Sequence, residues 1–264
     1  MVKLTIDLIG NKAQFAGMHF SHLMHNIPRP FSADHGHEAR QFFEADGEEI
    51  QDFVAAVAGS SPYLKGLIEK EHQWLRGAFA QHDAALKVEF SDLKATADSD
   101  LMSALRRAKR RVALWTALCD LAGVWALEEV TEALSKFADL ACQISLNHVL
   151  KLQLQRGKIP TRKPETDPAG LGMFVLAMGK LGANELNYSS DIDLICFFDE
   201  SYFASVDVFE ARAGFIRATK NMVALLNDIT AEGYVFRTDL RLRPDPSVTP
   251  VCMGVEAAEH YYES

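Results

Sequence analysis

Residues 173–200 read MFVLAMGKLGANELNYSSDIDLICFFDE and carry the clearest structural pattern in the chain. The apolar runs 173–178 and 191–198 are bounded by turn residues, which is typical of buried β-strands. Side chains two residues apart on a strand share a face, so Asp191 and Asp193 are expected to lie side by side while the residues between and after them face the core. The pattern predicts two strands joined by a turn in a small α/β domain.

The two aspartates point to a particular chemistry. Adjacent carboxylates at the head of an apolar strand repel one another, and a divalent cation removes that penalty. Oxygen ligands of this kind suit Mg²⁺, which commonly sits between carboxylates and the phosphates of a substrate. The alternative is a pair of solvated aspartates at a strand end, because the Asp-x-Asp tripeptide by itself is common.

The residues around the aspartates favour phosphate chemistry. Small residues that offer free backbone donors precede them, namely Gly179, Gly182, Ser189 and Ser190. A third strand is predicted over residues 234–243, and it places Asp239, Arg241 and Arg243 on one face. Three carboxylates for metal ions and two guanidiniums would stabilise the charge that develops in phosphoryl or nucleotidyl transfer. The alternative for the two arginines is that they pair with Asp245 and other surface acids.

The sequence predicts an α+β organisation with a mixed sheet in its last part. Four regions are expected: an irregular segment 1–33, a helical region 34–156, a proline-containing linker 157–170, and a nucleotidyltransferase-like domain 171–264. Apolar residues recur at helical spacing over 98–121, 126–152 and 207–231. The basic run RRAKRR at 106–111 is interpreted as the solvated face of its helix, with an acidic protein partner or a phosphate-facing wall as alternatives.

Composition excludes several classes of protein. The 264 residues include 27 basic and 36 acidic side chains, so the formal net charge is −9, which argues against a main role in binding nucleic acid. The 4 cysteines form no CxxC pair, so neither a zinc knuckle nor a disulfide framework is indicated. No apolar stretch is long enough to span a membrane and the first residues lack a signal-peptide plan, so we expect no membrane association and a cytoplasmic location.

Three stretches together resemble a known family. The runs MGKLGANELNYSSDIDLICFFDE, VFRTDLRLRPDPSVTP and AAEHYYES are similar to the bacterial glutamine synthetase adenylyltransferase/adenylyl-removing enzymes, which belong to the DNA polymerase β-like nucleotidyltransferase superfamily. The helical stretch that begins SSPYLKGLIEKEHQWL resembles the segment that precedes the nucleotidyltransferase domain, so the likeness covers residues from about 60 to 264. The family enzyme carries two such domains, and one copy is found here, which implies a fragment of a longer protein.

The resemblance implies specific roles. Asp191, Asp193 and Asp239 match the catalytic, Mg²⁺-binding aspartates, and Gly179 and Ser190 match the phosphate-side turn. Residues 187–190, just before the Asp-x-Asp pair, resemble the same segment in one of the family's two domains. That domain removes AMP from a tyrosine of glutamine synthetase by phosphorolysis, which releases ADP. AMP transfer from ATP and a catalytically silent regulatory module are the alternatives. Glutamine synthetase as protein substrate and a PII-type signalling protein are the partners that the family implies.

Overall fold

The computed structural model describes residues 18–160 and 171–263, and within these ranges the chain forms two compact units. The smaller unit comprises the described residues up to Val88 together with Ala117–Trp125, and the larger unit comprises the rest. Helices α5 (Ala85–Lys94) and α6 (Leu101–Leu121) each contribute residues to both units. No helix in the described ranges is both long and apolar enough to cross a lipid bilayer.

The smaller unit is built from short helices, α1 (Phe20–Leu23), α2 (Ala33–Gln41), α3 (Glu48–Ser60) and α4 (Pro62–Ala80). The break between α3 and α4 follows from local chemistry, because the Ser61 hydroxyl accepts a hydrogen bond from the Leu64 N–H and Pro62 occupies the first helical turn. Phenylalanine rings form the core, with the centroid of Phe20 at 5.1 Å from Phe79 and 6.3 Å from Phe53. Part of the predicted irregular segment, residues 1–17, lies outside the described residues.

The larger unit contains a four-stranded mixed sheet, as the sequence predicts for the α+β class. Strand β1 (Met173–Met178) runs antiparallel to β2 (Ile192–Phe198). Two short strands, β3 (Thr238–Asp239) and β4 (Cys252–Gly254), pair in parallel with the beginning and the end of β2. The first two strands confirm the sequence prediction, whereas β4 and the helix that follows it, α10 (Val255–Glu263), were not predicted.

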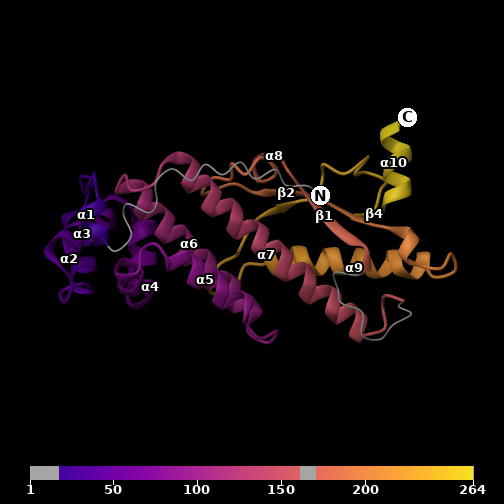
Figure 1. The fold of residues 1–264 in the computed structure, drawn as a ribbon, viewed down its shortest axis with the longest axis horizontal. Helices are drawn as coiled ribbons and strands as arrows, with labels where there is room; N and C mark the ends of the chain where they lie inside the picture. The colour runs from indigo at the N-terminus through magenta and orange to yellow at the C-terminus, as the bar shows by residue number, and fades with distance from the viewer. Residues whose placement is uncertain (1–17, 161–170, 264) are drawn as a thin grey trace. The chain divides into compact units, whose positions relative to one another are not determined.

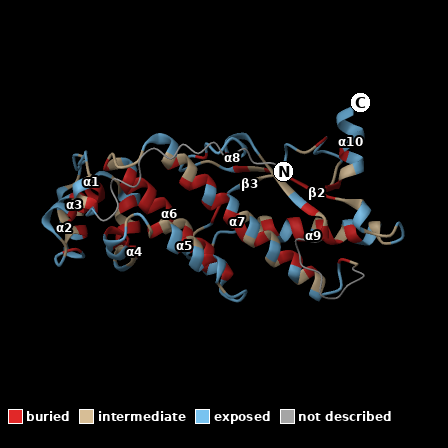
Figure 2. Cartoon of the chain, in the orientation of Figure 1, coloured by how far each residue is buried: buried red, intermediate tan, exposed pale blue. Residues whose placement is uncertain are grey.

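Helices cover the two faces of this sheet differently (Figure 1). The long helices α7 (Leu127–Gln155) and α9 (Val208–Asn227) pack against each other, and α9 also contacts β2 and β4. The rings of Phe198 and Phe215 lie 5.0 Å apart, so α9 covers the face to which Phe198 belongs. On the other face Phe197 is buried with Ala258 of α10. Figure 2 shows α7 and α9 with buried and exposed residues alternating along them, as amphipathic helices require.

The predicted third strand over 234–243 is wrong in its extent. Strand β3 ends at Asp239, and the chain then leaves the sheet for residues 240–251 and returns as β4 (Cys252–Gly254). Arg243 holds this excursion, because its guanidinium donates hydrogen bonds to the carbonyl oxygens of Leu240 (2.7 Å), Pro246 (2.8 Å) and Thr249 (3.3 Å). Leu242, which a continuous strand would place on the face opposite the arginines, is 51% exposed. Alternating leucine and arginine therefore marks a loop tied together by its own arginine.

We expect the larger unit to lose stability at alkaline pH, because it contains two buried thiols. Burial raises the pKa of Cys196 in β2 to about 12, and it also raises the pKa of Cys252, its register partner in β4. In the unfolded chain the thiols ionise at their ordinary pKa of 9.0, whereas in the folded chain they stay protonated to higher pH. The full stability of the folded chain is therefore present below pH 9, and it falls as pH rises above 9, because ionisation of the thiols favours the unfolded chain. We expect each thiol to cost roughly 1 kcal/mol of unfolding free energy per pH unit above 9.

Urea unfolding between pH 7 and 10.5 measures this loss. The Cys196→Ala variant provides the comparison, since its alkaline slope should be shallower than that of the unmodified chain. Identical slopes would mean that the thiols are not responsible.

Candidate active site

Two of the three predicted aspartates are direct neighbours in the sheet. Asp193 of β2 and Asp239 of β3 are paired in the parallel register, so their side chains leave the same face. Asp191 lies immediately before β2 and is exposed, whereas Ile192 and Leu194 are buried at 0% and 1% exposure. The apolar residues of the strand thus anchor it in the core and present the carboxylates on the face opposite α7 and α9.

An arginine lies on the third carboxylate. The Arg241 guanidinium donates from Nε to both carboxylate oxygens of Asp239, at 3.0 and 2.8 Å, and its backbone N–H donates to Oδ1 at 2.8 Å. The Arg241 side chain is 82% exposed, and this contact with Asp239 holds its head group. Arg241 was predicted to share a strand face with Asp239; the strand ends at Asp239, and Arg241 lies in the turn that follows, from which its side chain folds back onto the carboxylate.

The carboxylates differ in their electrostatic situation. Burial, and next the negative charges of Asp191 and Asp239, raise the pKa of Asp193. The hydrogen bonds from Arg241 lower the pKa of Asp239. The Arg241 guanidinium therefore mainly stabilises Asp239, and the unfavourable crowding of negative charge falls on Asp193. A further positive charge near Asp193 would relieve this strain.

A glycine turn brings the end of β1 against Asp193. Gly179 begins the short helical turn α8 (Gly179–Gly182) with φ of +55°, a left-handed conformation that favours glycine. A Cβ atom at this position would lie 2.9 Å from Oδ2 of Asp193. Glycine is needed here for two reasons, since it tolerates the backbone conformation and leaves room for the carboxylate.

The serine turn before β2 is held by an arginine that the sequence analysis missed. Arg237 donates from Nη2 to the Ser189 carbonyl at 2.8 Å, and its own carbonyl accepts from the Ile192 N–H at 2.9 Å. The Ser190 hydroxyl donates to the Asn187 side chain at 2.7 Å. Arg237 thus holds both sides of Asp191. Its position two residues before Asp239 was the signal in the sequence that could have indicated a place for Arg237 near the site.

The other predicted arginine lies in a different environment. Arg243 donates its guanidinium hydrogen bonds to carbonyl oxygens of its own loop. Of the residues predicted for the site, Asp193 is the register partner of Asp239, Gly179 lies against Asp193 and Arg241 binds Asp239. Asp191 lies close enough for its charge to raise the pKa of Asp193. Ser189 and Ser190 lie in the adjoining turn.

The donor set fits a divalent cation in its chemistry, but it is not assembled around one. Within residues 18–160 and 171–263, no three His, Cys, Asp or Glu side chains are gathered closely enough to hold a metal ion. Both oxygens of Asp239 accept hydrogen bonds from Arg241. The carboxylate oxygens are nevertheless the hard ligands that Mg²⁺ prefers. The raised pKa of Asp193 shows crowded negative charge, which a bound cation would neutralise.

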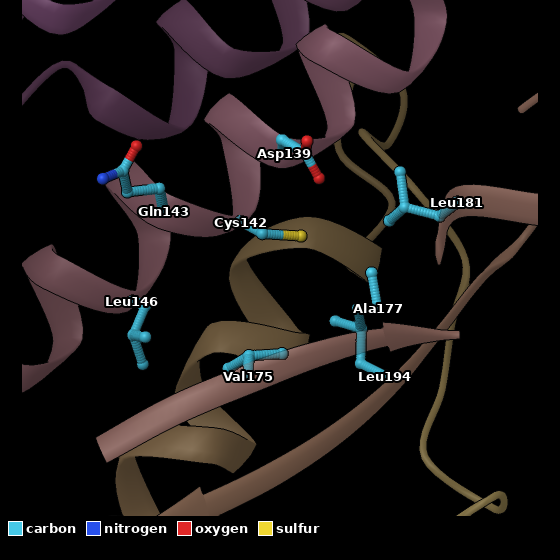
Figure 3. A pocket seen from close by; sticks show the side chains of 8 residues that line it. All are labelled: Asp139, Cys142, Gln143, Leu146, Val175, Ala177, Leu181 and Leu194. Atoms are coloured by element: carbon cyan, nitrogen blue, oxygen red, sulfur yellow. The ribbon is translucent and has the colours of Figure 1, made fainter. Parts of the chain in front are cut away.

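A cavity of about 300 Å³ lies on the opposite face of the sheet (Figure 3). Its walls come from Asp139, Cys142, Gln143 and Leu146 of α7 and from Val175, Ala177, Leu181 and Leu194. Ala177 and Leu194 are the immediate chain neighbours of residues on the carboxylate face, and side chains alternate along a strand. The cavity is therefore on the other side of the sheet from Asp193 and Asp239.

The basic run on α6 also departs from its interpretation as a solvated face. Arg106 is buried at 1% exposure, and burial lowers the pKa of Lys109 to about 8. Lys109 lies four residues after Leu105, on the apolar stripe of the helix, and this spacing was the signal available in the sequence.

Comparison with known proteins places this site in a family. The family model for glutamate-ammonia ligase adenylyltransferase matches residues 50–264, which is most of the chain. The chain belongs to the glutamate-ammonia ligase adenylyltransferase family. The aspartates, the glycine turn and the arginines described above all lie inside the matched region.

Curated members of this adenylyltransferase family are similar in sequence to about four fifths of the chain. A protein of Bradyrhizobium sp. (strain ORS 278) is 45% identical over 219 residues, and one of Agrobacterium fabrum is 39% identical over 227 residues. One of Brucella suis is 40% identical over 226 residues. Each is named bifunctional glutamine synthetase adenylyltransferase/adenylyl-removing enzyme. The match covers 81–82% of this chain and 22–23% of those relatives, so the chain spans less than a quarter of their length.

Proposed function

We propose that this chain removes AMP from an adenylylated tyrosine of glutamine synthetase by metal-dependent phosphorolysis. The observation that carries the proposal is the pairing of Asp193 with Asp239 on adjacent parallel strands, beside a glycine turn and an arginine. The lead-in at residues 187–190, which resembles the removing copy of the family, favours removal over transfer.

The reaction needs positioning more than it needs a general base. An oxygen of inorganic phosphate attacks the phosphorus of the tyrosyl-AMP ester, the bond from phosphorus to the tyrosine oxygen breaks, and ADP and tyrosine form once that oxygen takes a proton. Phosphate is already an anionic nucleophile at neutral pH, so catalysis depends on orientation and charge neutralisation. Asp191, Asp193 and Asp239 would hold Mg²⁺, which supplies Lewis-acid charge neutralisation at the phosphoryl oxygens.

The chain's own side chains would orient the phosphate. The planar fork of Arg241 suits a pair of phosphate oxygens, and the guanidinium is exposed apart from its contact with Asp239. The backbone around Gly179, Ser189 and Ser190 would approach the nucleotide side of the ester. Arg243, whose donors are engaged by loop carbonyls, would act mainly by holding the 240–249 loop.

Incubation with adenylylated glutamine synthetase, Mg²⁺ and phosphate tests the proposal, with ADP as the expected product. AMP transfer from ATP onto unmodified glutamine synthetase is the second candidate, because the relatives' printed name includes it. Detection of that transfer without ADP release would overturn removal. Absence of both reactions would favour a silent regulatory module.

A PII-type signalling protein is proposed as a further partner.

Replacing Gly179 by alanine should impair the site beyond its effect on folding. A left-handed alanine costs about 1–2 kcal/mol of unfolding free energy, and the added Cβ would also displace the Asp193 carboxylate. We expect urea unfolding to show the first effect and the deadenylylation rate to fall at least tenfold from the second.

Gly157→Ala is the matched control. Gly157 has φ of +60° but nothing within 4 Å of an added Cβ, so it should lose similar stability and keep its activity. Equal activity in the two variants would show that Gly179 is needed only for the turn.

A further inference from the structure

The position of Asp239 depends on chain segments outside the sheet. Strand β3 contains only Thr238 and Asp239, so it has few ladder hydrogen bonds with which to hold its own register. The ten residues 228–237, here called the connector, join the end of α9 to this strand. Whatever anchors the connector therefore decides where the third carboxylate lies relative to Asp193.

One buried guanidinium anchors the first part of the connector. Arg106 of α6 donates from Nε to the Gly233 carbonyl at 2.8 Å and from Nη2 to the Asp228 carbonyl at 2.5 Å. Its Nη1 donates to the carbonyls of Met102 at 3.0 Å and Leu225 at 3.4 Å. The side chain thus ties α6, the last turn of α9 and two points of the connector together. A guanidinium is suited to this task because it presents its donors in a rigid planar fork.

A second cation holds the end of the connector. The Lys109 ammonium lies 4.1 Å from the centroid of the Phe236 ring, which is 2% exposed and lies 5.6 Å from the Phe137 ring. An ammonium over an aromatic face is attracted by the ring, and more strongly where water is excluded. Phe236 precedes Arg237, whose carbonyl accepts the Ile192 N–H beside Asp191. The contact therefore acts three residues from Asp239.

We propose that Arg106 and Lys109 of α6 are positioning residues that set the place of Asp239 through the connector. This inference rests on the proposed function, because it assigns α6 a role in the same carboxylate site. Among the described residues, neither side chain has a hydrogen bond or ion pair with Asp191, Asp193 or Asp239, so their effect passes through the backbone of residues 228–237. Residues that orient metal ligands from outside the coordination shell typically change metal affinity ten- to a hundredfold when they are replaced.

Manganese binding to the complete 264-residue chain tests the inference. The dissociation constant of Mn²⁺ is measured from the electron paramagnetic resonance signal of the free ion, well below the unfolding temperature of each variant. Arg106→Lys keeps the charge but loses the fork, and we expect it to weaken Mn²⁺ binding at least tenfold. Lys109→Met keeps the length of the side chain and removes the ammonium, and we expect a smaller loss of roughly threefold.

Two controls separate positioning from general destabilisation. Arg107→Lys changes the exposed neighbour of Arg106 on the same helix and should bind Mn²⁺ as the unmodified chain does. Val149→Ala removes buried apolar volume from α7, where the side chain is 2% exposed, and should lower the unfolding temperature without changing Mn²⁺ affinity. An Arg106→Lys variant that behaves like Val149→Ala would overturn the inference.

The outcomes also distinguish this inference from the proposed function. Mn²⁺ binding that is lost in Asp193→Asn but unchanged in Arg106→Lys and Lys109→Met would overturn the positioning role and leave the carboxylate site intact. Mn²⁺ binding that responds to Arg106→Lys, in a chain that releases no ADP, would support positioning and reject the proposed reaction. A chain that binds no Mn²⁺ at all would reject both.

Discussion

Asp193→Asn should abolish deadenylylation while leaving the fold intact. The amide keeps the shape of the carboxylate and removes the charge that would bind Mg²⁺, so we expect the rate to fall at least about a thousandfold, or about 4 kcal/mol of transition-state stabilisation. Burial and the charges of Asp191 and Asp239 raise the pKa of Asp193, so the charged form is disfavoured in the folded chain. The unfolding temperature of the metal-free variant should therefore stay the same or rise slightly.

The rate of ADP release and the melting curve are measured on the same preparation. Glu210→Gln provides the matched control, because it removes an exposed carboxylate of α9 and should change neither quantity. A large drop in the melting temperature of Asp193→Asn would show that this aspartate is structural and would contradict its assignment to the active site.

Arg241→Lys should raise the phosphate concentration that deadenylylation requires. Arginine holds two oxygens of an anion in a fixed plane, as it already does with Asp239, whereas lysine offers a single point charge. A cation bound by the carboxylates would compete with Arg241 for Asp239 and so free the guanidinium for phosphate. We expect the KM for phosphate to rise, or the rate to fall, by about ten- to a thousandfold.

The neighbouring arginine supplies the comparison. Arg243→Lys loses hydrogen bonds to the carbonyls of Leu240, Pro246 and Thr249, so it should lower stability and change the phosphate dependence less than Arg241→Lys does. Unchanged phosphate dependence in both variants would mean that neither side chain binds phosphate.

Periodicity was a sufficient guide where an element is long or is an apolar run bounded by turn residues. The strands at 173–178 and 192–198 and the helices at 101–121, 127–155 and 208–227 lie where apolar spacing predicts them. The three helices and β2 each bury a continuous apolar stripe or face, whereas β1 is mostly half-buried. Apolar spacing predicts an element because burial of apolar surface is the dominant stabilising contribution.

The same reasoning failed where single polar contacts control the backbone. The run from Tyr234 to Arg243 alternates like a strand, yet only Thr238 and Asp239 pair with β2. Arg243 binds carbonyls of its own loop, and Arg241 folds back onto Asp239. A three-residue strand such as β4 has too few side chains to produce a detectable period.

The roles of charged residues divide in the same way. The Asp-x-Asp pair and the later aspartate could be recognised from the order and spacing of residues, since a strand necessarily places Asp191 and Asp193 on one side. The bond from Arg237 to Ser189 and the burial of Arg106 could not, because they join residues 48 and more than 100 positions apart. Local spacing encodes which residues share a face of one element, whereas only tertiary packing decides which distant carbonyl a guanidinium meets. The aspartates of this site and Arg241 can therefore be recognised from the order of the amino acids, whereas the contacts of Arg237 and Arg106 become evident only in the folded chain.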